Sequence, residues 1–319
     1  MALSDLQVFS EYAYSTMTEM LAYNVNLFNE ATRGAILLRT ANHQGDYSDQ
    51  AIWAKISGLV RRRNAYGAGA VAEKVLQQLL DTSVKVAAGT PPVRIDPSMM
   101  KWIQKSPEEA GATVGKQLAM DTIGDMLATG LLAYVAAMAV QATNYYDATG
   151  VGAGTANLAI LNSGRAKLGD RADEMACWVI HSKSLFDIYG VALANQNFLF
   201  NFGSVKVMSD GFGNPLIVSD VASLAAAGPV YYACGILPAG ILVDQNADFV
   251  DNVQTLNGDE NIKRTYQAEW SYNLGLKGLQ WDKTNGGHSP NDAAIGTGTN
   301  WDKYATSAKD LGGVLVKVK

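Results

Sequence analysis

The sequence is poor in cysteine, histidine and charge. Its 319 residues include two cysteines and three histidines, and 17% of them are charged. Cys177 and Cys234 are too few for a disulfide framework or a cysteine-built zinc site. His43, His181 and His288 lie far apart and lack the spacing of metal ligands. These absences predict a protein without a metal or another cofactor, and Cys177, inside an apolar run, is expected to be a buried, inert thiol.

An excess of positive charge is also missing. The 25 lysines and arginines are outnumbered by 30 acidic residues, and a net charge of −5 argues against a general nucleic-acid binder. Residues 1–5 show neither a basic segment nor an apolar run, so we expect no signal peptide and a reducing cytoplasm as the compartment. Hydrophobic residues make up 48% of the chain, which predicts a folded protein, and the low charge indicates that much of its surface does not face water.

Motifs that carry chemistry are scarce. Neither a Gly-x-Ser-x-Gly elbow nor a His-Glu-x-x-His metal motif occurs. Gly150, Gly152 and Gly154 follow a predicted helix and not a strand, which favours a flexible linker over a nucleotide-binding loop. Asp121 and Asp125 share one helix face, where a solvated surface or an ion pair is commoner than catalysis. No nucleophile, base and orienting group occur together, so no catalytic residue is predicted and an α/β enzyme is disfavoured.

Residues 126–146 contain no charged side chain, which allows two interpretations. The stretch approaches the length that crosses a bilayer, so it could be a membrane span. It could equally be the second half of a long helix in a folded protein. Its many alanines and its acidic flanks, Asp121, Asp125 and Asp147, favour the folded protein.

The long helix has a strong predicted start. Ser106 can cap it, Pro107 suits its first position, and Glu109 completes a capping box. Glu108 and Glu109 also lie at the positive end of the helix dipole. The pattern ends near Asn144, and a helix of about 38 residues would be about 57 Å long. Large apolar residues recur along it every three to five positions, at Val114, Leu118, Ile123, Leu127, Leu131, Val135 and Met138.

Shorter elements flank this helix. Before it we expect a partly helical amphipathic segment over 4–30, a helical piece over 48–59 and a short helix over 69–80. After it the pattern changes to mixed helix and strand. Apolar and polar residues alternate over 266–276, which predicts a long half-buried strand. Further strands are predicted at 176–181, 205–208, 216–219, 230–237, 241–243 and 314–318, with a helix capped by Ser182 after the first of them.

Arg61, Arg62 and Arg63 are the sharpest charge feature of the chain. An isolated basic run in an acidic chain fits an ion-pairing surface better than a nucleic-acid contact, because guanidinium groups bind carboxylates in bidentate fashion. Glu108 and Glu109 of a neighbouring subunit are candidate partners. These five residues are the predicted inter-subunit contacts.

Several motifs occur in an order that resembles one known family. They are ATRGAILLR at 31–39 with GDYS at 45–48, LVRRRN at 59–64, LGD at 168–170, WVIHSK at 178–183 with LF at 185–186, and PLIVSD at 215–220. Ile180 stands where that family has methionine, which keeps the position apolar. Over nearly its whole length the chain is similar to the major capsid proteins of tailed bacteriophages, which have the Hong Kong 97-type fold.

The resemblance implies an α+β fold with several parts. It implies an N-terminal arm, an extended loop that lies over a neighbouring subunit, a peripheral domain that contains the long spine helix, and an axial domain. The corresponding ranges are 1–32 for the arm, 33–70 for the loop, 71–149 and 236–319 for the peripheral domain with its spine helix at 106–145, and 150–235 for the axial domain.

The resemblance also implies the function. Many copies would self-assemble as pentamers and hexamers into an icosahedral head that encloses phage double-stranded DNA without sequence-specific binding. A separate scaffolding protein, a portal and a decoration protein are the expected partners, with no membrane. The location would be the virion, after assembly in the bacterial host cytoplasm. The alternatives are an encapsulin-like nanocompartment shell and, less favoured, a membrane-inserted protein that uses residues 126–146.

Overall fold

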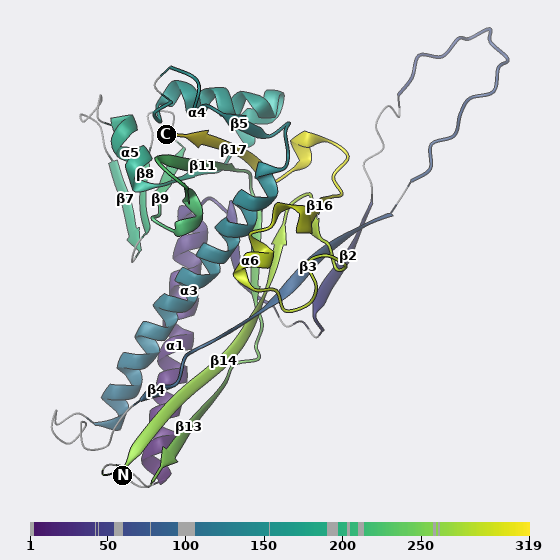
Figure 1. Ribbon diagram of the computed structural model, residues 1–319. Coiled ribbons are helices and arrows are strands. Elements are labelled where there is room, and N and C mark those ends of the chain that lie inside the picture. Colours follow the sequence, from purple (N-terminus) through teal and green to yellow (C-terminus); the bar gives the residue numbers. More distant parts are fainter. Residues whose placement is uncertain are drawn as a thin grey trace.

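Two β-sheets and two long helices make up the computed structural model (Figure 1). It describes residues 3–41, 43, 45–53, 60–76, 78–94, 106–152, 154–189, 197–202, 205–209, 214–257, 260 and 262–319. Within these residues one sheet has nine strands and the other has eight. The mixture of helices and sheets agrees with the α+β class expected from the sequence.

Helix α1 (Leu3–Ala31) lies beside helix α3 (Pro107–Ala139), and both start at the same end of the molecule (Figure 1). Leu21 and Phe28 continue a buried stripe of α1 that begins with Phe9, Ala13 and Met17. Their spacing of four or seven residues places them on one helix face. The segment predicted as partly helical is therefore a single helix, and its apolar face packs on α3.

The predicted start of α3 is confirmed. The Ser106 hydroxyl accepts a hydrogen bond from the Glu109 backbone N–H at 3.3 Å, and Pro107 occupies the first helical position. The helix ends at Ala139 and not near residue 145. The Asn144 amide donates to the carbonyls of Ala308 and Gly313 at 2.9 and 2.7 Å, and the chain at this point joins a sheet. These tertiary contacts end a helix whose sequence pattern continues.

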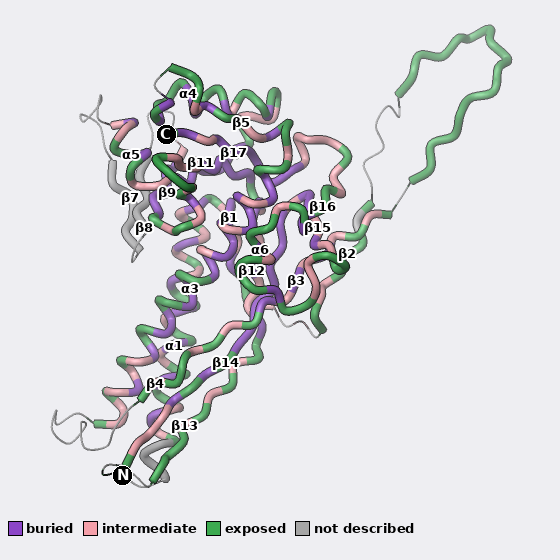
Figure 2. Tube along the Cα trace, viewed as in Figure 1, coloured by how far each residue is buried: buried purple, intermediate pink, exposed green. Residues whose placement is uncertain are grey.

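Of the described helices, α3 alone is long and apolar enough to cross a membrane by length and composition. Within the fold, 67% of its apolar window is buried (Figure 2). Its neighbours are α1, both sheets and the short helix α6 (Asp292–Ile295). The helix therefore occupies the place of a core helix, which agrees with the interpretation favoured by the sequence.

The first sheet is organised around one long strand, β14 (Lys263–Leu276). The alternation predicted for 266–276 holds in its first half, where Tyr266 and Ala268 are buried and Gln267 is exposed. Strand β14 pairs along its length with four other strands and meets β15 at its end. The other strands of this sheet are β1 (Ile36–Thr40), β2 (Tyr47–Trp53), β3 (Gln78–Gly89), β4 (Val93–Arg94), β12 (Ile241–Gln245), β13 (Val250–Leu256), β15 (Leu279–Trp281) and β16 (Trp301–Lys303).

The second sheet is buried on both faces at its centre. In β6 (Cys177–Ile180) the side chains of Cys177 and Val179 join the core around α3. Trp178 and Ile180 face a separate core that includes α4 (Leu158–Arg165) and α5 (Ser182–Tyr189). The order of strands is β5 (Tyr145–Asp147), β17 (Gly313–Val318), β11 (Val230–Ile236), β6, β9 (Pro215–Val218), β8 (Val205–Ser209) and β7 (Asn197–Phe202), with β10 (Ala225–Ala226) beside β11.

Two predicted helices before α3 are wrong. The described part of 48–59 is strand β2, and residues 54–59 lie outside the described chain. In 69–80, residues 69–76 have no regular structure and residues 78–80 begin strand β3. Strand β3 pairs with β2 and then with β14, and these long-range partners override the helical spacing of the apolar residues.

The sheets also bear on the expected domain division. Strands β17 and β5 pair in the second sheet, together with β6 and β11, which belong to the expected axial range 150–235 apart from Ile236. The resemblance implied that 71–149 and 236–319 belong to the peripheral domain. Strands β5 and β17 lie in these two ranges, but they pair with strands of the expected axial domain. The division into domains stays a prediction.

Two glycines allow α1 and α3 to approach closely, and they generate a first prediction. A Cβ on Gly115 would lie 2.4 Å from the Ala13 carbonyl oxygen, and one on Gly111 would lie 2.6 Å from the Phe9 oxygen. Gly115→Ala should therefore lower the free energy of unfolding of the unassembled chain by about 1–3 kcal/mol in urea denaturation. Gly124→Ala, on the same helix with open space at its Cβ, is the control and should raise it by about 0.5–1 kcal/mol. Equal effects would contradict close packing at Gly115.

Candidate functional site

The β2–β3 hairpin projects from the body of the molecule (Figure 1). Beyond the paired strands, residues 60–76 have no regular structure and are exposed along their length (Figure 2). Val60 and Tyr66 are 95% and 99% exposed, and three more large apolar residues follow them. These three are Val71, Val75 and Leu76. Exposed apolar side chains on a projecting segment are typical of a surface that another protein covers.

The three predicted arginines lie on this segment. Arg61, Arg62 and Arg63 are exposed, and within the described residues none of them pairs with a carboxylate. Their predicted partners, Glu108 and Glu109, lie at the start of α3, at the opposite end of the molecule (Figure 1). The fold therefore does not bring the two groups together within one chain, and their pairing between chains stays a prediction.

At the start of α3, the acidic side chain of Glu108 already has a hydrogen-bond partner. A hydrogen bond from the Ser106 side chain lowers the pKa of Glu108, which is half-buried. The carboxylate is thus ionised at neutral pH and favours the positive end of the helix dipole. The site remains open to a cation because Glu108 keeps its negative charge in water.

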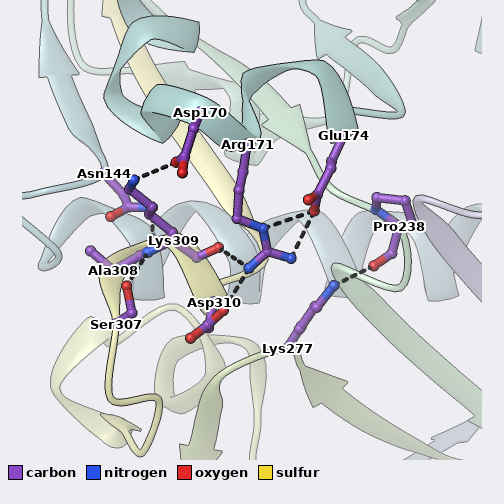
Figure 3. A network of polar contacts seen from close by, with 10 residues as sticks. All are labelled: Asn144, Asp170, Arg171, Glu174, Pro238, Lys277, Ser307, Ala308, Lys309 and Asp310. Carbon is purple, nitrogen blue, oxygen red and sulfur yellow. Dashed lines mark hydrogen bonds and ion pairs between the residues drawn. The ribbon is translucent and has the colours of Figure 1, made fainter. Parts of the chain in front are cut away.

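An ionic network joins three distant parts of the chain (Figure 3). Arg171, in the 3-10 helix η1 (Ala166–Glu174), contacts Glu174 Oε2 at 2.7 Å and Asp310 Oδ1 at 2.5 Å. It also donates to the Lys309 carbonyl at 3.1 Å. Lys309 in turn pairs with Asp170, and this pairing lowers the pKa of Asp170. The network fastens the C-terminal segment, with its 3-10 helix η4 (Ala308–Asp310), to η1.

Lys277, which directly follows strand β14 of the first sheet, also belongs to this cluster. Its ammonium group donates to the Pro238 carbonyl at 3.0 Å, and burial, with Arg171 as a second cause, lowers its pKa. Gly169 provides the turn before Asp170, with a φ of 60°. The Gly-Asp motif that carried part of the resemblance therefore has a structural role.

His181 has local partners. Its Nδ1 accepts a hydrogen bond from the Lys183 backbone N–H at 3.1 Å, so Nε2 carries the proton of the neutral ring and lies 3.6 Å from Asp220. The ring also packs on Tyr231, with centroids 4.7 Å apart. The cap of α5 comes from His181, whereas the sequence predicted Ser182, which is the first helical residue.

The remaining candidate groups are the carboxylates of Asp121 and Asp125 and the thiol of Cys177. Asp125 accepts a hydrogen bond from the Tyr272 hydroxyl at 2.9 Å, and burial raises its pKa, while Asp121 on the same face is exposed. Cys177 is fully buried, and burial raises its pKa to about 12, which confirms the unreactive thiol. Over the described residues, no three His, Cys, Asp or Glu side chains gather as a metal site.

The glycine segment after β5 forms hydrogen-bonded turns. Val151 N–H donates to the Ala148 carbonyl, and Gly154 N–H donates to the Val151 carbonyl, both at 2.9 Å. Gly152 and Gly154 have φ values of 59° and 72°, which favour glycine. The Lys319 N–H donates to the Gly154 carbonyl at 2.7 Å. Residues 148–152 and 154 therefore take part in hydrogen-bonded turns beside Lys319, where the sequence predicted a flexible linker.

Sequence reasoning missed the strand β3 and the Arg171 network. A signal for β3 was present, because Leu80, Thr82, Val84 and Val86 alternate with polar residues. No local signal marked the network, because its members come from three distant segments, around residues 171, 277 and 310.

The network generates a second prediction. Arg171→Ala removes ionic contacts with Glu174 and Asp310 and should lower the free energy of unfolding by about 1–2 kcal/mol, with partial exposure reducing the effect. Lys183→Ala removes the i,i+4 pair between the exposed Lys183 and the half-buried Asp187 on one helix and should change this free energy by at most about 0.5 kcal/mol. Urea denaturation of the unassembled chain measures both. A loss for Arg171→Ala no larger than for the control would show that the network does not fasten the C-terminal segment.

Comparison with known proteins shows which structures and which family this chain resembles. Among curated proteins no sequence matches, and solved structures match at low identity. The capsid of Ralstonia phage GP4 is 11% identical with a TM-score of 0.51, over 89% of this chain and 87% of that one. The cyanophage Pam1 capsid asymmetric unit is 11% identical with a TM-score of 0.50, over 89% and 88%. These likenesses confirm the Hong Kong 97-type fold.

A third structure is more distant. The holo-SrpI encapsulin complex of Synechococcus elongatus PCC 7942 is 10% identical with a TM-score of 0.48, over 75% of this chain and 81% of that one.

The family model described as Gp13-like, major capsid protein 13-like, matches residues 5–315. A projecting hairpin, a spine helix and a match over almost the whole length agree, so this chain belongs to the Gp13-like family of major capsid proteins and its role is structural.

Proposed function

We propose that copies of this capsid protein assemble as pentamers and hexamers into a closed icosahedral head around double-stranded DNA. The observation that carries the proposal is the projecting β2–β3 hairpin with its exposed apolar loop. A single chain leaves Val60, Tyr66 and Val75 in water, and contact with a neighbouring subunit would bury them. A shell of many copies supplies such a neighbour for every hairpin.

The parts of the chain then take separate roles. We assign the extended loop to the β2–β3 hairpin with residues 60–76, because β1, at the beginning of the expected range 33–70, pairs with β12 inside the first sheet. The first sheet with α3 is the proposed peripheral domain. The second sheet, which includes β5 and β17, is the proposed axial domain. In this assignment the expected arm, residues 1–32, contains helix α1 over Leu3–Ala31, which packs on α3.

The remaining proposals concern partners and place. A net charge of −5 suits a lining that encloses DNA without holding it by sequence-specific contacts. A separate scaffolding protein, a portal and a decoration protein are proposed partners, with no membrane, and assembly is proposed in the bacterial host cytoplasm. We propose no catalytic activity, because the candidate groups Asp125, Cys177 and His181 occupy structural contacts.

Assembly itself is the third prediction. We expect the purified protein, tested both with and without a candidate scaffolding protein, to form closed particles in at least one of the two conditions. The particles should sediment in a sucrose gradient and measure tens of nanometres across in negative-stain micrographs. Tyr66→Ser combined with Val71→Ser and Val75→Ser should reduce particle yield at least tenfold. The three substitutions remove apolar side-chain surface that a neighbouring subunit would bury. The conservative variant with Val71→Ile and Val75→Ile is the matched control and should assemble normally.

The variants should leave the unassembled chain equally stable, since all three side chains are exposed. Normal particle yield from the serine variant would contradict the role of the hairpin. A species that stays small under every condition would contradict the shell. Particles that copurify with a cargo enzyme and need no scaffolding protein would favour a nanocompartment over a phage head.

The charge pairing between subunits gives the fourth prediction. Arg61→Glu, Arg62→Glu and Arg63→Glu together should lower particle yield, because glutamates would meet Glu108 and Glu109 of the neighbour. Adding Glu108→Arg and Glu109→Arg should restore part of the yield by exchanging the charges. The Glu108→Arg, Glu109→Arg chain alone is the control for the cost of placing cations at the start of α3. Unchanged yield after the first reversal, or no recovery in the combined variant, would rule out this pairing.

A further inference from the structure

The root of the projecting hairpin is a well-defined point in β3. Residues 78–84 of this strand pair with β2, and residues 84–89 pair with β14. Val84 belongs to both ladders, so the strand leaves the body of the sheet at this residue. A strand supported on one side only can change its direction with little loss of hydrogen bonds. Contacts close to Val84 therefore decide the direction in which the hairpin points.

Residues 279–304 contact both strands of the hairpin at this root (Figure 1). On β2, Asp49 pairs with Lys283, with Nζ 2.6 Å from Oδ2, and its other oxygen accepts from the Thr82 hydroxyl at 2.8 Å. The Lys283 ammonium also lies 5.1 Å from the centre of the Tyr47 ring. These contacts hold β2 beside the loop that follows β15.

On β3, Asp81 contacts Tyr304 just after β16. The Tyr304 hydroxyl lies close enough to the Asp81 carboxylate to lower its pKa, and it accepts a hydrogen bond from the Gly278 backbone N–H at 3.3 Å. The carboxylate oxygen Oδ1 of Asp81 is buried and has no hydrogen-bond partner. An ionised carboxylate with one buried, unpaired oxygen is costly, while the protonated acid is not. This half of the root is therefore sensitive to the protonation of Asp81.

We propose that residues 279–304 act as a clamp that fixes the direction of the β2–β3 hairpin, and that the clamp holds more tightly when Asp81 is protonated. With Asp81 ionised, the hairpin gains by moving until Oδ1 reaches water. With Asp81 protonated, the carboxyl group stays against Tyr304 and the hairpin stays docked. The clamp is a property of the single chain and goes beyond the shell role, so it stands whether or not the shell forms.

The groups around Asp81 support tighter docking of the hairpin when Asp81 is protonated. Burial raises the pKa of Asp81 to about 6, and the Tyr304 hydroxyl opposes the rise. Tyr304 is the titratable group that faces it, while Asp49, with Lys283 and His43 acting on it, belongs to the contacts of the other strand. Because the docked pKa lies above the value of 3.8 for a free side chain, docking strengthens as the pH falls through about 6 and weakens as it rises.

Hydrogen exchange on the unassembled chain tests the clamp as a fifth prediction. Protection of the amides in 47–53 and 78–84, corrected for intrinsic exchange, should rise about tenfold between pH 7 and pH 5. Asp81→Asn keeps an oxygen acceptor and cannot ionise, so its protection at pH 7 should match the wild type at pH 5 and change less than about twofold with pH.

Asp49→Asn is the matched control. It removes the ion pair with Lys283, so protection should fall at both pH values while the tenfold dependence remains. Amides of β11, which lies in the other sheet, should show no such dependence in any variant. A wild-type chain whose hairpin protection is independent of pH, or an Asp81→Asn chain that keeps the tenfold change, would overturn the proposal.

Discussion

The close packing of α3 against its surroundings is the constraint on which the rest of the fold depends. At its start, Gly111 and Gly115 let the backbone of α1 approach to a distance that no larger residue permits. At its other end, the buried Tyr134 hydroxyl lies 3.1 Å from the Gly235 carbonyl and 3.3 Å from that of Val314, in two strands of the second sheet. One helix thus fixes α1 and both sheets relative to one another.

Burial around this spine explains why so little surface is left for chemistry. The thiols of Cys177 and Cys234 lie in the core, and the Asp125 carboxylate is occupied by Tyr272. Some of the exposed polar groups fasten segments together, as in the Arg171 network (Figure 3). The projecting hairpin gathers exposed apolar and basic side chains at one extremity, where a neighbouring subunit can reach them.

The hairpin combines two properties that suit a subunit of a shell. Its loop offers apolar and positively charged side chains to a neighbour, and its root is held by only a few polar contacts. A segment that is strongly paired on one side and lightly clamped on the other can change direction without unfolding the sheet. In the proposed shell, subunits of pentamers and hexamers would meet their neighbours at different angles, so such freedom would suit a shell of identical chains.

The sequence by itself determined the elements whose signals are local. Ser106-Pro107 and the acidic first turn define the start of α3 because a helix cap involves only neighbouring residues, and alternation defines β14 because its faces differ in burial. The order of short motifs also indicated the fold. Only the tertiary structure decided where α3 ends, because Asn144 is held by residues more than 160 positions away. It likewise made 78–89 a strand, because β2 and β14 supply its hydrogen bonds, and it separated Arg61–Arg63 from Glu108 and Glu109, whose meeting needs a second chain.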